Sequence, residues 1–333
     1  MHVMITGVAG FIGAGLALRL LERGDMVTGI DNLNDYYEVS LKEARLARLM
    51  PSKQFSFFKA DISDPEAMRK LFSENRFDAV VNLAAQAGVR YSIENPAAYI
   101  DANLVGFGHI LEGCRHSGVG HLVYASSSSV YGSNSKLPFS EKDNVDHPIS
   151  LYAASKKANE LMAHAYSHLY AIPATGLRFF TVYGPWGRPD MAYFKFTKKI
   201  LEGKKIDIYN RGKMYRDYTY IDDIVDGIYK LINRRPLLNP KRKLKNDSLS
   251  SVAPFRILNI GNTKKVFLLD FINTLEKELK TKIIKNYMPM QKGDVYTTLS
   301  DSSLLKKITG YNPKTNYKVG IKKFINWYLN YYH

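Results

Sequence analysis

The segment from His2 to Asp31 constrains the fold of this 333-residue chain more than any other feature of its sequence. It begins with an apolar run at 2–6, passes through a glycine-rich turn, and continues in a helical pattern at 14–23. A strand-like run at 26–30 follows. A strand, a helix and a strand within about 30 residues form a βαβ unit, which predicts a parallel sheet.

The turn in this unit, TGVAGFIG, carries three glycines whose spacing suits a dinucleotide. Gly7 permits the tight turn, Gly10 lets the backbone approach a pyrophosphate, and Gly13 allows close packing of the helix on the strand. The positive end of the helix would face the phosphates. With Phe11 and Ile12, these glycines form the predicted cofactor-binding turn.

An acidic residue ends the second strand, as dinucleotide binding requires. Asp31, followed by Asn32, can accept hydrogen bonds from the ribose hydroxyls of an adenosine. A carboxylate there would repel a 2′-phosphate, and the nearby cations, Lys42 and Arg45, lie further along the chain. NAD is therefore favoured over NADP.

Helical and strand patterns go on alternating as far as residue 180. The predicted helices cover 40–50, 65–74, 97–116 and 152–170, and the predicted strands cover 55–60, 78–83, 121–126 and 174–180. Strands rich in Val, Ile and Phe between amphipathic helices imply a parallel sheet covered on both faces. We expect an α/β fold, a doubly wound parallel Rossmann sheet, with residues 1–180 as the NAD-binding domain.

The ends of the third and fourth strands supply further expected cofactor contacts. Asp61 and Ile62 follow the third strand, where the adenine should lie, and ordinary packing at a strand end is the alternative. Leu83, Ala84 and Ala85 follow the fourth, where small residues would admit the phosphates and the nicotinamide ribose.

Residues 181–333 are expected to form a smaller, partly interleaved α/β lobe that binds the substrate. Short helices near 193–202, 222–233 and 268–280 lie among strands such as 206–209 and 257–260. Between them, 234–254 is rich in basic residues, Pro and Ser, which predicts a surface loop. Its basic cluster is Arg234, Arg235, Lys241, Arg242, Lys243 and Lys245.

The formal charge of +16 lies entirely in the C-terminal part. Residues 1–190 carry 18 Lys and Arg against 19 Asp and Glu, and residues 191–333 carry 29 against 12. Such a field favours an anionic ligand, a nucleic acid or an acidic membrane face, and a solvated basic surface explains it equally well.

Cysteine content and hydropathy indicate a cytoplasmic protein. The single cysteine, Cys114, permits no internal disulfide and offers no metal-ligand spacing, so no metal is expected. No Lys or Arg precedes the apolar residues at 1–18, and glycines interrupt them. No other window has about 18 uncharged apolar residues, so no integral membrane association is expected.

The segment YAASK places Tyr152 and Lys156 four residues apart on one helical face. An ammonium, together with the positive nicotinamide ring of NAD⁺, would stabilise the phenolate and lower the Tyr152 pKa, which makes it a usable base. Strand 121–126 runs into SSSSVYG, hydroxyls at the strand end where such sheets bind ligands. Surface placement of the Tyr–Lys pair and capping roles for the serines are the structural alternatives.

TGVAGFIG, SSSSVYG and YAASK, in this order, resemble the extended short-chain dehydrogenase/reductases. NLNDYYEVSLKEARLARL, QAGVRYS and RFFTVYGPWGRPDMA are similar to segments of bacterial UDP-glucuronate 4-epimerases. The resemblance implies bound NAD⁺ that is reduced and reoxidised in each cycle. Tyr152, helped by Lys156, would take the 4-hydroxyl proton, and Ser127 matches the catalytic Ser or Thr.

The resemblance also implies contacts with a UDP-sugar. Arg188 would grip the uronate carboxylate, with Thr181 and Arg90 as further contacts; a turn salt bridge for Arg188 and helix-start packing for Arg90 are the alternatives. Arg216 resembles a pyrophosphate clamp. The remaining expected substrate residues are Ser127, Ser128, Gln291 and Asp294.

The serine segment bears on the reaction. Related dehydratases and decarboxylases carry an acidic residue there, which this chain lacks, so epimerisation at C4 between UDP-glucuronate and UDP-galacturonate is expected. The alternatives are a UDP-glucose or UDP-N-acetylhexosamine 4-epimerase, a UDP-glucuronate decarboxylase or other net dehydrogenase, and a Rossmann redox sensor or nucleic-acid-binding protein. Intact Tyr152, Lys156 and Ser127 argue against the last, so no nucleic acid partner is expected.

A homodimer is expected through helices 97–116 and 152–170. Their apolar faces resemble those that pair across a two-fold axis in relatives, and burial within the monomer is the alternative for part of each face. The residues of the two faces are Leu104, Phe107, Leu111, Leu161, Met162, Ala165 and Leu169.

Overall fold

The computed structural model describes residues 1–238, 244, 246–291 and 293–333. Its centre is a seven-stranded sheet in the order β10-β6-β5-β4-β1-β2-β3, in which every neighbouring pair is parallel. The strands are β1 (His2–Thr6), β2 (Met26–Asp31), β3 (Phe55–Lys59), β4 (Ala79–Asn82), β5 (Leu122–Ser127), β6 (Ala174–Phe179) and β10 (Phe255–Ile260). Because buried parallel strands read as continuous apolar runs, the sequence located the first six within about two residues.

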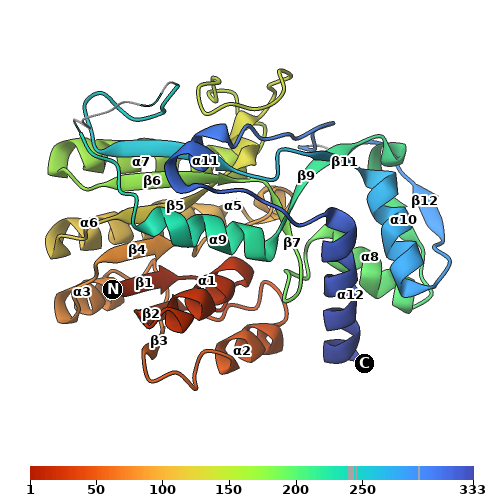
Figure 1. Cartoon of the computed structure of the whole chain (residues 1–333), viewed down its shortest axis with the longest axis horizontal. Coiled ribbons are helices and arrows are strands. Elements are labelled where there is room, and N and C mark those ends of the chain that lie inside the picture. The colour runs from red at the N-terminus through yellow and green to blue at the C-terminus, as the bar shows by residue number, and fades with distance from the viewer. Residues whose placement is uncertain (239–243, 245, 292) are drawn as a thin grey trace.

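Helices cover both faces of this sheet (Figure 1). On one face α1 (Phe11–Glu22) packs against α9 (Ile221–Ile232), and on the other α6 (Phe107–Ser117) packs against α3 (Pro65–Glu74) and α7 (Leu151–Tyr170). The doubly wound α/β architecture is thereby confirmed.

The predicted helix 97–116 is not one regular helix. It consists of α5 (Pro96–Tyr99), a π-helix, η1 (Ile100–Gly106), and α6. Within η1 the Asn103 side chain accepts a hydrogen bond from the Gln86 backbone (2.8 Å) and donates to the Ser155 hydroxyl (3.0 Å) on α7. π-helical turns are frequent at functional sites, and this one ties the end of β4 to the helix that carries Tyr152.

The chain returns to the large sheet after residue 181, so the expected boundary at 180 does not divide the molecule in space. β10 pairs with β6, and α9 and α11 (Ser303–Thr309) cover it, although all three come from the segment assigned to the smaller lobe. Interleaving is therefore more extensive than a simple two-domain division allows.

The remaining elements build the smaller lobe and the edges of the molecule (Figure 1). A three-stranded sheet has the order β11-β9-β7, and β12 pairs with β8. The sequence patterns missed β7, β9, β11 and β12, most of them too short to show a period. The bounds are α2 (Val39–Ala47), α4 (Tyr91–Glu94), η2 (Ser128–Tyr131), β7 (Thr181–Tyr183), α8 (Ala192–Leu201), β8 (Ile206–Ile208), η3 (Tyr209–Gly212), β9 (Tyr215–Tyr220), β11 (Lys265–Phe267), α10 (Leu268–Leu279), β12 (Lys285–Tyr287) and α12 (Tyr317–Tyr332).

The predicted basic loop 234–254 has no helix or strand in its described part, where Arg234 and Arg235 are exposed. The other four residues of its basic cluster, Lys241, Arg242, Lys243 and Lys245, lie outside the described residues.

Candidate active site

The glycine turn between β1 and α1 brings backbone segments too close together for side chains. Gly7 has a φ of +69°, and a Cβ there would lie 2.8 Å from the backbone nitrogen of Ala84. A Cβ on Gly13 would lie 2.2 Å from the Gly7 carbonyl oxygen. Gly10 caps α1 without a side chain, and no acidic residue occupies the first turn, where Phe11 and Ile12 lie. The N-terminal end of α1 is therefore suited to an anion such as a pyrophosphate.

Asp31 lies beside this turn and is buried. Its carboxylate accepts hydrogen bonds from the backbone N–H groups of Ala9 (3.1 Å) and Leu33 (2.9 Å), so its direction is fixed. Burial raises the Asp31 pKa, while those hydrogen bonds and the charges of Lys42 and Arg45 act in the opposite direction. Both cations donate to backbone carbonyl oxygens, so neither is set aside for a 2′-phosphate.

The other predicted cofactor residues follow the ends of neighbouring strands. Asn32 donates to the Asp61 carboxylate at 2.7 Å, which joins the ends of β2 and β3. Ile62 is buried in the apolar cluster around α3 and α6, as the packing alternative required. Leu83, Ala84 and Ala85 follow β4, and the Ala84 N–H donates to the Thr6 hydroxyl (3.1 Å).

The tyrosine and lysine of α7 meet the serine segment as the sequence predicted. Ser150 caps α7 by accepting a hydrogen bond from the Ala153 N–H (3.1 Å), which starts the helix one residue before Tyr152. The Tyr152 hydroxyl lies close enough to Ser127, at the end of β5, for hydrogen bonding to lower its pKa, and Lys156 is buried one turn further along. The strand end and the helix start thus place these three groups together.

The sequence expectation combines Lys156 with the nicotinamide ring of NAD⁺, and the side chains of the protein alone do not lower the Tyr152 pKa. Burial raises the Tyr152 pKa, against the lowering effects of the Ser127 hydrogen bond and the positive charge of Arg188. Burial also lowers the Lys156 pKa to about 8, because a desolvated ammonium is costly. The lowering of the Tyr152 pKa therefore needs more positive charge than these side chains provide, and the nicotinamide ring of NAD⁺ is the group that would supply it.

The four serines at the end of β5 and the start of η2 have separate roles. The Ser126 hydroxyl donates to Glu160 (2.6 Å), which also forms a buried ion pair with Arg178 at 2.8 Å. Ser127 contacts Tyr152, while Ser128 and Ser129 line a cavity. The Glu160 carboxylate is occupied by Arg178, so it does not replace the acid that the serine segment lacks. No local sequence pattern indicates this ion pair, because its partners lie on separate elements.

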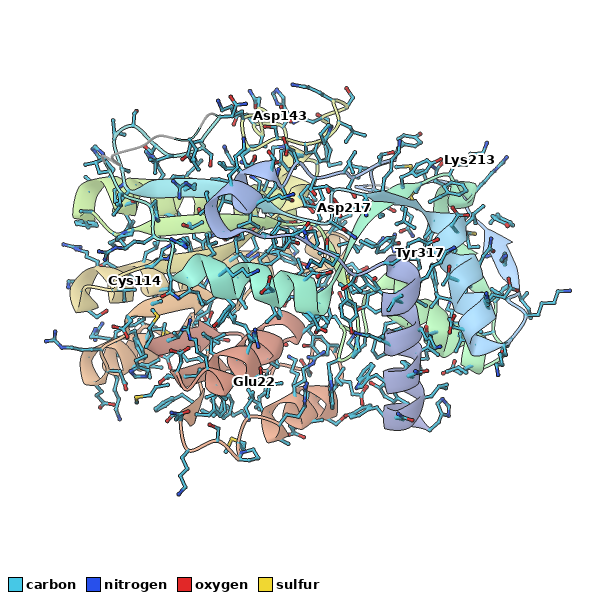
Figure 2. The ribbon with its side chains drawn as sticks, in the orientation of Figure 1. Glu22, Cys114, Asp143, Lys213, Asp217 and Tyr317 are labelled. Atoms are coloured by element: carbon cyan, nitrogen blue, oxygen red, sulfur yellow. The ribbon has the colours of Figure 1, made fainter. Side chains whose placement is uncertain are left out.

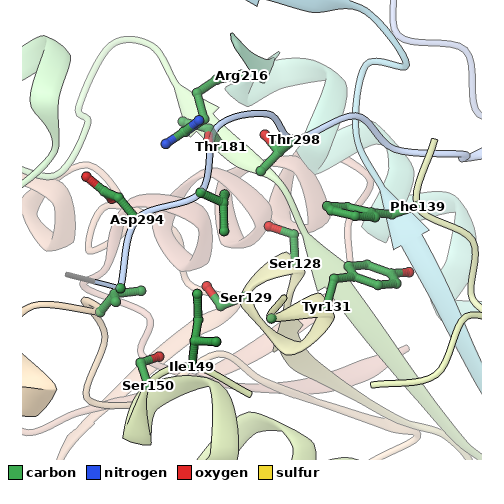
Figure 3. Close-up of a pocket in the computed structure, with 14 residues that line it drawn as sticks. Ser128, Ser129, Tyr131, Phe139, Ile149, Ser150, Thr181, Arg216, Asp294 and Thr298 are labelled. Carbon is green, nitrogen blue, oxygen red and sulfur yellow. The ribbon is translucent and has the colours of Figure 1, made fainter. Parts of the chain in front are cut away.

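A cavity of about 160 Å³ opens beside the serine segment, between the large sheet and the smaller lobe (Figure 3). Four predicted substrate residues line it: Ser128, Thr181, Arg216 and Asp294. Thr181 comes from β7 and Arg216 from β9, two strands that pair in parallel, so distant sequence segments meet here. Sequence reasoning had not assigned a role in the site to the lining residues Val89, Ser129, Tyr131, Gly132, Phe139, Ile149, Ser150 and Val295.

The other predicted substrate residues do not line this cavity. Arg188 forms a bidentate ion pair with Asp190, with Nε–Oδ1 at 3.0 Å and Nη2–Oδ2 at 2.5 Å, although its charge still reaches Tyr152. The half-exposed Arg90 forms an ion pair with Asp294 (3.1 Å), so its first partner is a carboxylate of the protein. Gln291 lies next to Lys292, which is outside the described residues, and is not part of the lining.

Asp217 organises the backbone behind Arg216 and lies near the centre of the molecule (Figure 2). Its buried carboxylate accepts hydrogen bonds from the backbone N–H groups of Asn262 (2.8 Å) and Ser300 (3.0 Å) and from the Ser300 hydroxyl (2.6 Å). It thereby holds the segment that carries Thr298 against β9. In the sequence, the feature that could have indicated this role is that Asp217 directly follows the predicted clamp arginine, Arg216.

The glycine turn, Asp31 and the Ser127–Tyr152–Lys156 group define a Rossmann-type enzyme that works on a nucleotide-linked substrate with NAD. The model of the NAD dependent epimerase/dehydratase family matches residues 3–242. The chain belongs to this family, as its residues had indicated.

Several relatives match the chain almost from end to end. Protein CapI of Staphylococcus aureus is 52% identical over 100% of this chain and 99% of its own length. A probable UDP-glucuronate 4-epimerase of Rhizobium meliloti is 47% identical over 98% of this chain and 97% of its own length. The UDP-glucuronic acid 4-epimerase of Bacillus cereus, solved in complex with UDP-glucuronic acid and NAD, is 31% identical, with a TM-score of 0.88 over 100% of both chains.

No helix among the described residues is both long and apolar enough to cross a bilayer.

Proposed function

We propose that this chain is a UDP-glucuronate 4-epimerase, which interconverts UDP-glucuronate and UDP-galacturonate. Ser127, Tyr152 and Lys156 lie together beside a cavity lined by Thr181 and Arg216, and the serine segment contains no acidic residue. This arrangement is the observation that carries the proposal. Homologues with this name and a neighbour bound to UDP-glucuronic acid and NAD support it.

In this proposal the Tyr152 phenolate accepts the proton of the 4-hydroxyl while Ser127 holds that hydroxyl by a hydrogen bond. NAD⁺ held by the glycine turn and Asp31 would supply the acceptor for the hydride from C4 and the donor for its return to the opposite face of the 4-keto sugar. Tyr152 then gives the proton back, and Lys156 favours its phenolate form. Atoms and electrons balance over the cycle, since the hydride returns to C4 and the proton returns to the oxygen on C4.

The substrate contacts divide between the two ends of the ligand. Arg216 lines the cavity and would meet the pyrophosphate, and Ser128 and Thr181 would meet the sugar. Asp294 and Arg90, which form an ion pair at 3.1 Å, would lie at the opening of the cavity. Gln291 would be a further nucleotide contact. The predicted turn, Asp31, Asn32, Asp61 and the residues after β4 would hold NAD.

A 4-keto uronate is a β-keto acid, and Arg188 would keep it from losing CO₂. Decarboxylation breaks the C5–C6 bond, and its electron pair enters the carbonyl π-system to give an enolate that takes up a proton. A carboxylate held out of line with that π-system reacts slowly. Asp190 grips the Nε–Nη2 edge of Arg188, so the Nη1 side of the guanidinium would meet the substrate.

The decisive test incubates purified protein with UDP-glucuronate, without added NAD, and follows the products by NMR. UDP-galacturonate at equilibrium and no CO₂ is the expected result. A UDP-pentose as the main product, or no turnover while UDP-glucose reacts, would contradict the proposal in favour of a decarboxylase or a UDP-glucose 4-epimerase.

Replacing Arg188 tests the uronate anchor. Arg188→Ala should raise the yield of UDP-pentose relative to epimer by about tenfold or more. Displacing a reacting group such as the uronate carboxylate by ~1 Å can change rates on the order of 100-fold. Product ratios from NMR give the measurement. An unchanged ratio together with an unchanged KM would rule Arg188 out as the anchor.

We also propose a cytoplasmic homodimer. Phe107 and Leu111 are buried within the monomer, but Leu161 is 59% exposed and Leu169 66% exposed on α7. Two large apolar side chains on the solvent-exposed face of α7 support a subunit interface at that face. The NAD requirement and the single cysteine, Cys114, which is buried, support the location.

A further inference from the structure

Arg45 on α2 is fully buried, yet among the described residues no carboxylate lies within ion-pair distance of it. Its guanidinium donates to backbone carbonyl oxygens. Nη1 contacts Ala9 (3.0 Å), Nη2 contacts Trp186 (2.7 Å) and Gly187 (3.0 Å), and Nε contacts Trp186 again (3.1 Å). Nη1 also meets the Tyr37 hydroxyl (2.7 Å).

A buried guanidinium is costly unless its donors are satisfied, and here five hydrogen bonds satisfy them. A lysine could not replace it, because an ammonium lacks the planar fork that reaches carbonyls on both sides. Arg45 is therefore built into this position for its geometry.

The turn that Arg45 grips is strained. Trp186 has a φ of +63°, a left-handed conformation that is unfavourable for a residue other than glycine. This conformation turns the carbonyls of Trp186 and Gly187 toward the same guanidinium. Next to it, a Cβ on Gly187 would lie 2.0 Å from the Tyr193 hydroxyl, so the turn is tightly packed. Arg188 follows immediately.

The other end of Arg45 reaches the cofactor turn. The Ala9 peptide is held from both sides, because its carbonyl accepts from Arg45 and its N–H donates to Asp31. One side chain thus connects the segment that would hold the pyrophosphate with the segment that carries Arg188.

We infer that Arg45 is a positioning residue that fixes the Arg188 turn relative to the cofactor turn, and so keeps the uronate carboxylate out of line for decarboxylation. This inference rests on the proposed function, in which Arg188 is the anchor. Arg45 touches neither sugar nor reacting atoms, so its effect passes through the backbone of Trp186 and Gly187.

The chain contains a built-in optical reporter of this turn. Its two tryptophans are Trp186 and Trp327 of α12, whose rings lie 5.3 Å apart. In a Trp327→Phe background, tryptophan emission comes from Trp186 alone. Its wavelength and quenching by acrylamide then report directly on the turn that Arg45 holds.

The experiment compares Arg45→Met and Arg45→Lys with the parent enzyme, each with and without Trp327→Phe. We expect Arg45→Met to raise the ratio of UDP-pentose to epimer about tenfold and to red-shift and expose Trp186, and Arg45→Lys to fall between it and the parent. Tyr37→Phe removes only one of the groups that accept a hydrogen bond from Arg45, so it should fold even if the Arg45 variants do not. It should give a smaller rise in the ratio of UDP-pentose to epimer.

Arg48→Met is the matched control, because Arg48 is the C-cap residue of the same helix and stacks on the Trp186 ring (4.7 Å) without bonding the turn backbone. It should leave the product ratio unchanged, since Trp327 and Tyr331 also hold that ring. A folded Arg45 variant with the parent ratio and parent Trp186 emission would overturn the inference. If the parent itself fails to epimerise UDP-glucuronate, the proposed function falls, and Trp186 emission still tests the grip of Arg45 on the turn.

Discussion

At the scale of single residues, burial dominates the chemistry of the site. Lys156 is buried and Tyr152 is partly buried. Desolvation favours the neutral form of each side chain, so it raises the Tyr152 pKa and lowers the Lys156 pKa. The Ser127 hydrogen bond and the charge of Arg188 oppose this for Tyr152. In the proposed function, the positive charge of bound NAD⁺ would add to these two effects in favouring the Tyr152 phenolate.

Removing the Tyr152 hydroxyl should therefore abolish most of the turnover and leave binding intact. Tyr152→Phe is expected to lower kcat by about 100- to 10,000-fold, the usual contribution of a positioned general base, with little change in KM. Steady-state assays by NMR measure both. A Tyr152→Phe enzyme with near-parent kcat would show that another group takes the proton.

At the scale of elements, connections between distant segments hold the site together. Asp217 binds β9 to the segment around Ser300, Asn103 binds η1 to α7, and His121 binds α9 to the large sheet. The His121 ring bonds the Ile232 carbonyl (2.9 Å) at the end of α9 and the Thr175 hydroxyl (2.9 Å) on β6.

His121 predicts a defined loss of stability in acid. Burial lowers its pKa from 6.5 to about 4 in the folded protein, so the unfolded chain binds an extra proton between these values. Stability from this group is full above pH 6.5 and falls by about 3 kcal/mol as pH drops to 4. Urea unfolding across that range should show a shallower pH dependence for His121→Gln than for the parent. Equal slopes for the two proteins would exclude this role.

At the scale of the whole molecule, the site lies between two interleaved parts of the chain. β10 and α9 return to the large sheet from the C-terminal segment, so the two parts share one core. The exposed apolar residues of α7 lie outside that core. An assembly that covers them would bury the helix that positions Tyr152 and Lys156.

Charge on that helix face should therefore separate the proposed dimer. Leu161→Glu is expected to give a monomer with a lower melting temperature, because a buried unpaired carboxylate opposes association. Val319→Glu, at a 51% exposed apolar position on α12, is the matched control and should not change the mass. Sedimentation velocity measures the outcome. A parent protein that already sediments as a monomer would contradict the proposal.

The sequence by itself determined the parallel sheet, the glycine turn, Asp31 and the Tyr152–Lys156 pair, because each depends on residues close together in the chain. Local periodicity and turn chemistry act over a few residues, so a single sequence displays them. The short strands β7 and β9 and the return of β10 were decided only by tertiary packing.

The same division applies inside the site. That Arg90 pairs with Asp294 and that Arg45 reaches the Trp186 turn are decided by segments 204 and 141 residues apart. No local pattern encodes which of several cations meets which partner, because packing and hydrogen-bond geometry settle it only in the folded protein. The sequence predicted the type of functional group at each strand end. The tertiary structure decided which of these side chains bond to other groups of the protein.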